Sequence, residues 1–520
     1  MKRKIYSVLF ILFATVLLLT LASCNASMNK ADSEHAPNAG PVGDPNYIFP
    51  NATMPESAPD EPDGDKSEDE NGNAFVENPF IATDENNIST LSADVDTASY
   101  TYFRKLVNNG YSWQELNRYS ANFRTEEFLN YFKYTATQPD ENELFSVNSS
   151  LFPCPWNEQT VLFSMTLQAA DATPTAGNNL VFLVDVSGSM MSSDKLPLLK
   201  KAFSYLTDQL GENDIISIVT YSGKETVVLD GCSGNKKETI LAAIDSLVAG
   251  GSTNGEAGLQ KAYQIAEKHR IEGGNNRIIM ASDGDLNVGI SSESALKEYI
   301  TQKREAGIFL SVLGFGTGNY RDQKMETLAD NGNGVYLYVD GEAEAEKIFS
   351  TDLLANLYTV AKDVKMQVTF DKTYVASYRL IGYENRILNE EDFTDDTKDA
   401  GEVGAGHQIT VFYELRLAEG AKTENTNWLE LAVNYKLPDE TVSVLPNLYN
   451  IGYADYTDAP NEDRIFMMAV IETCMLLHNS NYLPEGFDLD DILENLSALD
   501  LSDYPERAEF RELLKKLNTK

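Results

Sequence analysis

Hydrophobic residues between positions 178 and 362 occur in short, nearly continuous runs that are separated by segments of helical period. The runs predict strands near 180–184, 214–221, 225–229, 277–282, 308–315 and 335–339. Runs without alternation are typical of strands buried on both faces, as in a parallel sheet covered by helices. The pattern therefore predicts an α/β domain with a doubly wound, mostly parallel sheet over residues 178–362.

The flanking segments alternate apolar and polar residues instead, which is typical of strands with one buried face. Phe145–Leu151 and Thr160–Gln168 precede the α/β domain, and Val364–Phe370, Gln408–Leu417 and Trp428–Tyr435 follow it. Such strands need partners. We therefore expect the α/β domain to be inserted in a small antiparallel sheet that is built from strands on both sides of it.

Helical period marks both ends of the folded region. Residues 92–134 read as helical, with Phe103 and Phe128 among the expected core, and helices are expected again from Asp463 to Leu517. The Met and aromatic residues of the second segment are interpreted as the core of a helical cap. The expected units are a helical segment plus strands at 88–177, the α/β domain at 178–362, a β-rich domain at 363–458 and the cap at 459–520.

The chain begins with the pattern of an export signal. Lys2-Arg3-Lys4, an apolar stretch and Leu21-Ala22-Ser23-Cys24 follow one another. This arrangement resembles the signal of bacterial lipoproteins, which implies a signal peptide over residues 1–23, cleavage before Cys24 and attachment of a lipid to its thiol. The alternative is a signal anchor that is not cleaved.

Acidic residues outnumber basic ones by 80 to 41, which gives a formal net charge of −39. This charge disfavours nucleic acids and anionic surfaces as partners. Its densest part lies in residues 24–87, which lack periodicity and are expected to form an extended, disordered tether. Beyond the signal, the longest apolar run, Ile465 to His478, is too short to span a bilayer.

The remaining cysteines, Cys154, Cys232 and Cys474, are scattered and do not form a disulfide framework. We expect buried free thiols, although one pair could oxidise outside the cell. The histidines are far apart in the sequence and show no zinc-binding spacing.

A run of oxygen donors, Asp185-Val186-Ser187-Gly188-Ser189, directly follows the predicted strand at 180–184. Ligands of open α/β sheets bind where such strands end. Two later segments add donors of the same kind: Thr253 lies in the glycine-rich segment 250–255, and Asp283-Gly284 follows another apolar strand. Oxygen donors without nitrogen or sulfur suit Mg²⁺ or Mn²⁺.

Together these segments resemble the metal-ion-dependent adhesion site of the von Willebrand factor type A domain, whose motif combines D-x-S-x-S, T and D-G on a dinucleotide-fold-like sheet. The resemblance implies that Ser187, Ser189 and Thr253 are direct or switchable metal ligands, whereas Asp185 and Asp283 act largely through bound water. It also implies one open coordination position for a carboxylate of a partner.

Other segments resemble a bacterial family of lipoproteins with a type A domain: Ser92–Tyr100, Pro153–Asn157, Gly273–Arg277 and Leu380–Arg386. Within the first of them, Asp94 and Asp96 are interpreted as caps of the helix that follows, the alternative being contact with another ion. Gly314-Phe-Gly316-Thr-Gly318 lacks the spacing of a dinucleotide-binding loop and is interpreted as a turn beside the metal face.

The sequence does not present a nucleophile, a base and an orienting group together, so we do not expect an enzyme. We expect a membrane-anchored, divalent-cation-dependent binding or adhesion protein whose metal takes an acidic side chain of a protein partner or an anionic glycan. It would face outside the cytoplasm, at the outer membrane if the cell has two membranes. Two alternatives stay open: an envelope assembly factor that partners an ATPase-driven complex, and a metal-assisted hydrolase.

Overall fold

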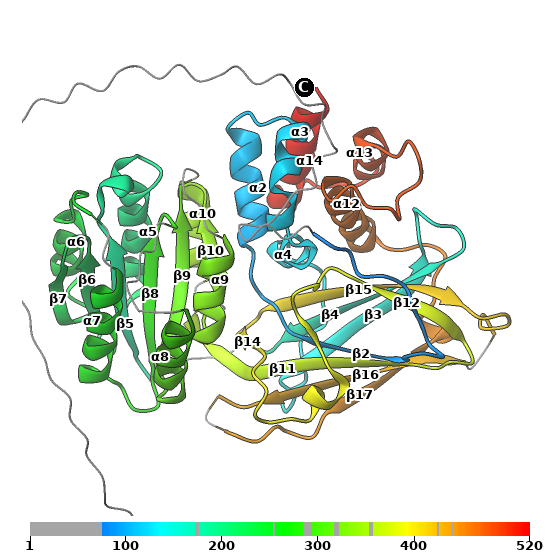
Figure 1. Ribbon diagram of the computed structural model, residues 1–520, viewed down its shortest axis with the longest axis horizontal. Helices are drawn as coiled ribbons and strands as arrows, with labels where there is room; N and C mark the ends of the chain where they lie inside the picture. The colour runs from blue at the N-terminus through cyan, green and yellow to red at the C-terminus, as the bar shows by residue number, and fades with distance from the viewer. Residues whose placement is uncertain are drawn as a thin grey trace, which may run out of the picture. The chain divides into compact units, whose positions relative to one another are not determined.

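The computed structural model describes residues 75–171, 176–252, 255–284, 293–316, 322–352, 357–423, 426–438 and 440–519 of the 520-residue chain (Figure 1). The expected signal peptide, Cys24, most of the expected tether and Thr253 lie outside the described residues. Within the described ranges, no helix is both long enough and apolar enough to cross a bilayer.

The α/β domain contains one mixed sheet with the strand order β10-β9-β8-β5-β6-β7. Neighbouring strands are parallel except for β6 and β7, which are antiparallel. The strands are β5 Asn178–Asp185, β6 Ile215–Tyr221, β7 Glu225–Ser233, β8 Asn275–Ser282, β9 Phe309–Phe315 and β10 Tyr336–Val339. The predicted mostly parallel sheet is confirmed, and β7 extends further than its apolar residues indicated.

Helices cover both faces of this sheet (Figure 1). Successive residues of β5 point to opposite faces, so Leu180 and Phe182 pack with α5 and α6, whereas Val181 and Leu183 pack in the core with α7, α8 and α9. The first face carries α5 Leu196–Gln209, α6 Lys237–Asp245, α10 Glu342–Glu346 and the π-helix η3 Lys347–Thr351. The second carries α7 Gly255–Lys268, α8 Glu293–Glu305 and α9 Asp322–Asn331.

Two antiparallel sheets lie outside the α/β domain, with the orders β1-β12-β15-β4-β3 and β13-β2-β11-β16-β17; β14 pairs with β11. Strand β4 precedes the α/β domain and β15 follows it, and the two pair from Val161 opposite Leu415 to Gln168 opposite Gln408. The predicted insertion of the α/β domain is therefore confirmed. The strands are β1 Ile81–Ala82, β2 Ile88–Ser92, β3 Phe145–Pro153, β4 Val161–Ala169, β11 Thr359–Phe370, β12 Val375–Ile381, β13 Ile387–Leu388, β14 Gly401–Gly404, β15 Gln408–Leu417, β16 Asn427–Lys436 and β17 Asn447–Gly452.

The prediction of a single small sheet was wrong. Every residue of β4 is buried, so both of its faces are covered. One face packs against the second sheet: Phe163 and Met165 share a core with Val368 and Leu431. The second sheet supplies the apolar surface that a single sheet would have left exposed to water.

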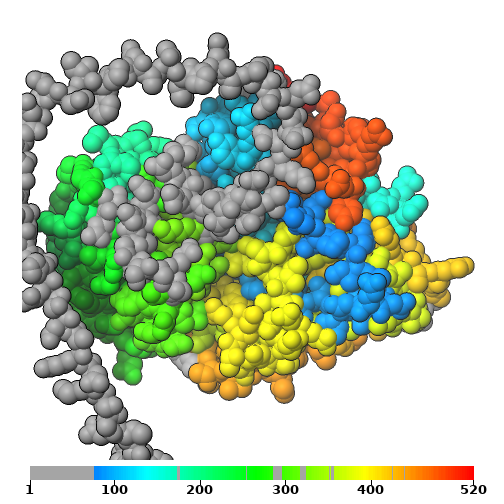
Figure 2. Space-filling view, in the orientation of Figure 1, coloured from blue at the N-terminus to red at the C-terminus, as the bar shows by residue number. Residues whose placement is uncertain are grey.

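The segment from Phe75 to Ala82 lies against the β domain, although the expected tether extended to residue 87. Ile81 and Ala82 pair with Tyr378 and Ser377 of β12. The Asn78 side-chain amide donates to the carbonyl of Gly382 at 2.8 Å. Figure 2 shows residues just after position 75, in blue, on the surface beside segments coloured yellow and orange. The tether therefore ends earlier than its polar composition indicated.

Helices from both ends of the folded region form one layer. Phe132 follows α4 and contacts Phe466 of α12 at 4.8 Å between ring centroids, and Phe466 contacts Phe510 of α14 at 5.7 Å. The predicted C-terminal helices are confirmed, and the N-terminal helices complete their core. The helices of this layer are α2 Ala98–Asn108, α3 Trp113–Leu116, η1 Asn117–Asn122, α4 Thr125–Tyr131, α12 Glu462–Leu477, α13 Leu489–Ser497 and α14 Pro505–Asn518; the short helices η4 Glu390–Phe393 and η5 Tyr453–Asp455 lie against the β strands.

Asp94 and Asp96 were expected to cap α2, but they do not. The cap residue Thr97 makes no side-chain capping bond, and the amide of Ser99 is bound by Glu127 at 2.7 Å. Asp96 instead accepts a hydrogen bond from the amide of Tyr336 in β10 at 2.8 Å. Both carboxylates are buried and attach the chain before α2 to other parts of the fold.

Arg386 lies at the centre of a group of carboxylates in this region. It forms ion pairs with Asp94 at 3.2 Å and with Glu326 and Asp330 of α9 at 3.2 and 3.0 Å. Asp96 lies 3.7 Å from the same guanidinium. Two of the segments that carried the bacterial resemblance, Ser92–Tyr100 and Leu380–Arg386, thus meet at one helix of the α/β domain.

The three described cysteines are free: Cys154 and Cys474 are buried, and Cys232 is half-buried. The expectation that they form no disulfide framework is confirmed for these residues. Burial raises the pKa of the Cys474 thiol well above its ordinary value, which keeps it in the unreactive thiol form.

Candidate metal centre

The predicted metal ligands lie where β5 and β8 end. Asp185 is the last residue of β5, and Asp283 follows the last residue of β8, Ser282. Because β5 and β8 are parallel neighbours, both strands end at the same edge of the sheet. The short helix η2, Gly188–Met191, continues the chain after Asp185 and carries Ser189.

The loop after β5 is fixed by backbone hydrogen bonds to two neighbouring segments. The amide of Val186 donates to the carbonyl of Tyr221 at the end of β6, at 3.0 Å. The amide of Gly188 donates to Gly251 at 3.1 Å. Gly251 has a φ of 90°, and a Cβ there would come within 2.8 Å of Ser222 Oγ, so this contact requires glycine. Thr253, two residues further on, lies outside the described residues.

Hydrogen bonds hold the donors of the β5 loop close together. The amide of Ser187 donates to Asp185 Oδ1 at 2.8 Å, which turns the chain back over the carboxylate. The hydroxyls of Ser187 and Ser189 lie 2.9 Å apart. Ser282 Oγ is 3.4 Å from the other oxygen of Asp185. These contacts bring Asp185, Ser187 and Ser189 to one place.

The electrostatics of the loop favour a cation. Asp185, Ser187 and Asp283 are buried, and Ser189 is half-buried. Burial raises the pKa of the Asp185 carboxyl to about 6, the hydrogen bond from the Ser187 amide lowers it, and repulsion by Asp283 adds to the rise. A positive charge beside these carboxylates would relieve both the burial of charge and the repulsion.

Lys195 supplies such a charge, although nothing in the sequence motif marks it as part of the site. Its Nζ donates to Asp283 Oδ2 at 2.7 Å, and the two side chains are 12% and 0% exposed. Lys195 is the residue before α5, six positions beyond Ser189. In the sequence, Lys195 is visible only as a lysine that follows the D-x-S-x-S run. The path of the loop in the structure shows that the Lys195 side chain reaches the end of β8.

A divalent cation suits the donors present. They are carboxylate and hydroxyl oxygens at one sheet edge, the chemistry that Mg²⁺ and Mn²⁺ prefer. Burial raises the pKa of Asp185 to about 6, and a bound cation would stabilise this carboxylate in its charged form. The described residues therefore fit the metal that the type A resemblance implied.

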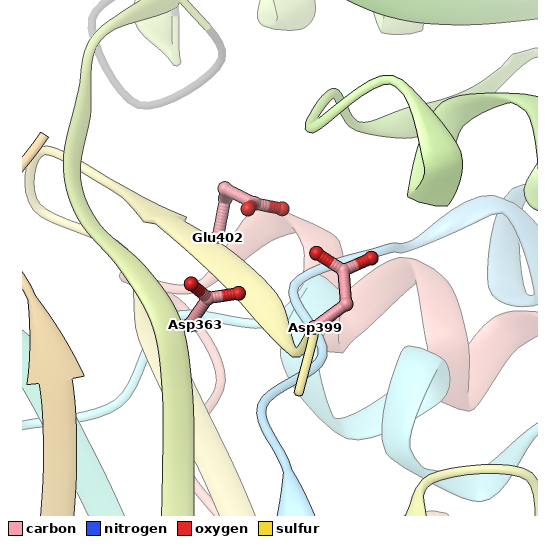
Figure 3. A group of neighbouring side chains, drawn as sticks. All are labelled: Asp363, Asp399 and Glu402. Carbon is pink, nitrogen blue, oxygen red and sulfur yellow. The ribbon is translucent and has the colours of Figure 1, made fainter. Parts of the chain in front are cut away.

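A second group of acidic residues lies at the boundary of β11 and β14. Asp363, Asp399 and Glu402 place carboxylate oxygens within 4.8 Å of one another, and Figure 3 shows their side chains grouped around a common space. Sequence spacing gave no sign of this group, because the pairing of β11 with β14 brings it together.

Basic side chains already balance much of its charge. Lys436 donates to Asp363 at 2.6 Å, and Arg304 donates to Asp399 at 2.6 Å. Glu402 Oε1 has no hydrogen-bond partner within the described part of the chain, and burial and the two aspartates raise the pKa of Glu402 well above its ordinary value. Because Lys436 and Arg304 already neutralise the two aspartates, we assign no metal to this group.

Family models match three consecutive parts of the chain. The model for von Willebrand factor matches residues 66–164, and the model for the von Willebrand factor type A domain matches 179–351. The model for the C-terminal part of the uncharacterized protein YfbK matches 355–519. The type A match includes the ends of β5 and β8.

The uncharacterized protein YfbK of Escherichia coli (strain K12) is 39% identical over 436 residues, which cover 79% of this chain and 74% of that protein. Inter-alpha-trypsin inhibitor heavy chain H3 of Homo sapiens is 25% identical over 272 residues, 49% of this chain and 30% of that protein. Among solved structures, a von Willebrand factor type A protein from Catenulispora acidiphila has a TM-score of 0.41 and 15% identity; the match covers 75% of this chain and 89% of that one.

Proposed function

The chain belongs to the YfbK family of bacterial proteins with a von Willebrand factor type A domain, and from this premise we propose that it is a membrane-anchored binding protein that captures its ligand through a divalent cation. Type A domains typically mediate protein interactions, often with a bound metal, and are typically not enzymes. Beyond these family properties, we propose the adhesion-type function, the membrane anchor and the class of ligand.

The single observation that carries the proposal is the set of oxygen donors at the end of β5. Asp185 is fully buried, and its backbone turn places the hydroxyls of Ser187 and Ser189 2.9 Å apart. These hydroxyls would be direct ligands of Mg²⁺ or Mn²⁺, together with Thr253. Asp185 and Asp283 would hold the charge and orient water around the ion.

A metal held in this way offers an open coordination position to a carboxylate oxygen. A partner would supply that oxygen from an acidic side chain, or an anionic glycan would supply it. The protein's own role is to hold the ion at a rigid sheet edge and to present it to the partner. The net charge of −39 supports recognition through the metal, because the protein surface as a whole repels acidic ligands.

Capture from the native envelope tests this function. Immobilised full-length protein should retain a partner in buffer with Mg²⁺ and should release it when EDTA is added. The Thr253→Ala variant should retain less partner, because the resemblance makes Thr253 a ligand that joins the metal in the high-affinity state. A partner that stays bound equally in Mg²⁺ and EDTA would contradict the proposal.

The proposal also includes anchoring through Cys24. Two acyl chains give stable membrane attachment where one is marginal, so lipidated Cys24 should hold the protein at the membrane, facing outside the cytoplasm. Cys24→Ser should abolish this attachment and move the protein from the detergent phase to the aqueous phase on partitioning. Cys232→Ser, which changes a half-buried free thiol, is the matched control and should stay with the membrane. Retention of the Cys24→Ser protein in the detergent phase would show that the anchor is of another kind.

A further inference from the structure

Lys195 is held against the metal centre by the fold around it. Its ammonium group donates to Asp283 at 2.7 Å. Its aliphatic chain passes over Gly316, which has a φ of 74°; a Cβ at that position would come within 2.3 Å of Lys195 Cε. The carbonyl of Gly316 accepts a hydrogen bond from the Tyr338 hydroxyl at 2.9 Å, which holds Gly316 in place. The absence of a side chain at Gly316 therefore leaves room for the aliphatic stem of this lysine.

We propose that Lys195 is a built-in competitor of the divalent cation: its ammonium group occupies Asp283 when the metal is absent and must leave it for the metal to bind. Lys195 would thereby set the concentration of Mg²⁺ at which the site becomes able to take a ligand. This inference rests on the proposed function, because it assigns to Lys195 a role in filling the same site.

Charge provides the physical reason. Asp185 and Asp283 are both buried, at the ends of the neighbouring parallel strands β5 and β8. Without a nearby cation, the state in which both buried carboxylates are charged would be strongly disfavoured. The ammonium group offsets one of these charges in the metal-free protein. A metal that binds must first break this charge-assisted hydrogen bond, so part of its binding energy is lost.

The position of Lys195 strengthens the competition. Asp283 is fully buried on its side chain and Lys195 is only 12% exposed, so water screens their attraction weakly. The lysine belongs to the same chain as the site and directly precedes α5. It is therefore an intramolecular competitor, and the metal concentration needed to displace it does not depend on the protein concentration.

Calorimetric titration of the full-length protein with MgCl₂ tests the inference. Lys195→Met keeps the length of the stem and removes the charge, so it should bind Mg²⁺ at least about tenfold more tightly than the wild type, the lower end of the contribution of a charge-assisted hydrogen bond. Lys195→Arg keeps the charge and should bind close to the wild type. In EDTA, Lys195→Met should melt at a lower temperature than the wild type, because Asp283 loses its counter-charge.

Lys201→Met is the matched control. Lys201 lies on α5 and pairs with the exposed Glu342, so its loss changes the net charge equally without touching the metal centre. Its affinity for Mg²⁺ should equal that of the wild type. Lys195→Gln provides a second neutral variant in case methionine impairs folding, and it should also bind Mg²⁺ more tightly.

The outcomes separate the inference from the proposed function. If the wild type binds Mg²⁺ and the neutral Lys195 variants bind it equally or more weakly, the competitor role is wrong and the metal centre stands. If neither the wild type nor any of the variants binds Mg²⁺, both the proposed function and the inference are wrong. If Lys201→Met also binds Mg²⁺ more tightly than the wild type, the gain in affinity comes from the change in net charge. That result would also overturn the competitor role of Lys195.

Discussion

Replacing Arg386 with methionine should lower the free energy of unfolding by about 3–5 kcal/mol, the range found when one partner of a buried ion pair is removed. Arg386 is 12% exposed and faces Asp94, Glu326 and Asp330 within 3.2 Å. Without the guanidinium, the buried carboxylates of Asp94 and Glu326 lose a counter-charge and repel each other and the partly exposed Asp330. Denaturant unfolding of the wild type and the variant measures the difference.

Arg270→Met is the matched control for this prediction. Arg270 is exposed, and its guanidinium donates to the carbonyl of Ala306, so its replacement should change stability by less than about 0.5 kcal/mol. An Arg386→Met protein as stable as the control would show that the carboxylates around Arg386 are protonated or solvated, and that this ion-pair group does not hold the α/β domain to its neighbours.

Asp185→Ala should abolish the stabilisation of the protein by Mg²⁺. A ligand that binds the native state stabilises it by about 2.7 kcal/mol at a hundred times its dissociation constant. The wild type should therefore melt at a higher temperature in saturating Mg²⁺ than in EDTA, and Asp185→Ala should melt at the same temperature in both. Differential scanning calorimetry measures these temperatures.

The metal-free proteins provide the check on folding. Asp185 is a buried carboxyl whose pKa is raised to about 6, so its charged form destabilises the metal-free fold at neutral pH. Removing it offsets the loss of the hydrogen bond from the Ser187 amide, and the variant should melt close to the wild type in EDTA. Ser193→Ala, an exposed change on the same loop, should respond to Mg²⁺ like the wild type. A Mg²⁺ response that survives in Asp185→Ala would remove Asp185 from the metal centre.

Local sequence patterns predicted the features that depend on chain order. The apolar run before Asp185 and the run before Asp283 predicted parallel strands, and parallel strands end at the same edge of their sheet. The alternating segments before and after the inserted domain predicted strands that pair across it, and the pairing of β4 with β15 confirms this, although the sequence did not indicate which strands would be partners.

Features that depend on tertiary contacts were not predicted. Residues 75–82 contain proline and polar residues without periodicity, yet their hydrogen bonds to β12 and Gly382 come from residues about 300 positions away. The second sheet was missed because its strands β2 and β13 are short and β2 adjoins a segment that reads as helical.

Lys195 and Arg386 illustrate the same limit at single residues. The sequence marks both as basic residues near recognisable motifs, but the acidic partners of Arg386 lie 56 or more positions away, and that of Lys195 lies 88 positions away. Charge alone predicts a solvent-exposed side chain in such cases. Burial of the partner carboxylates, which only the fold establishes, makes each of these residues a structural counter-charge.

Anomalous diffraction from crystals of the protein grown with Mn²⁺ tests the central claim most directly, because it locates the ion without assuming its ligands. The account predicts a manganese peak within about 2.2 Å of the hydroxyls of Ser187 and Ser189, the range in which hard cations bind oxygen. It also predicts that the Lys195 ammonium has moved away from Asp283 in those crystals. A peak at Asp363, Asp399 and Glu402 with none at Ser187 would contradict the account and transfer the metal to the other acidic group.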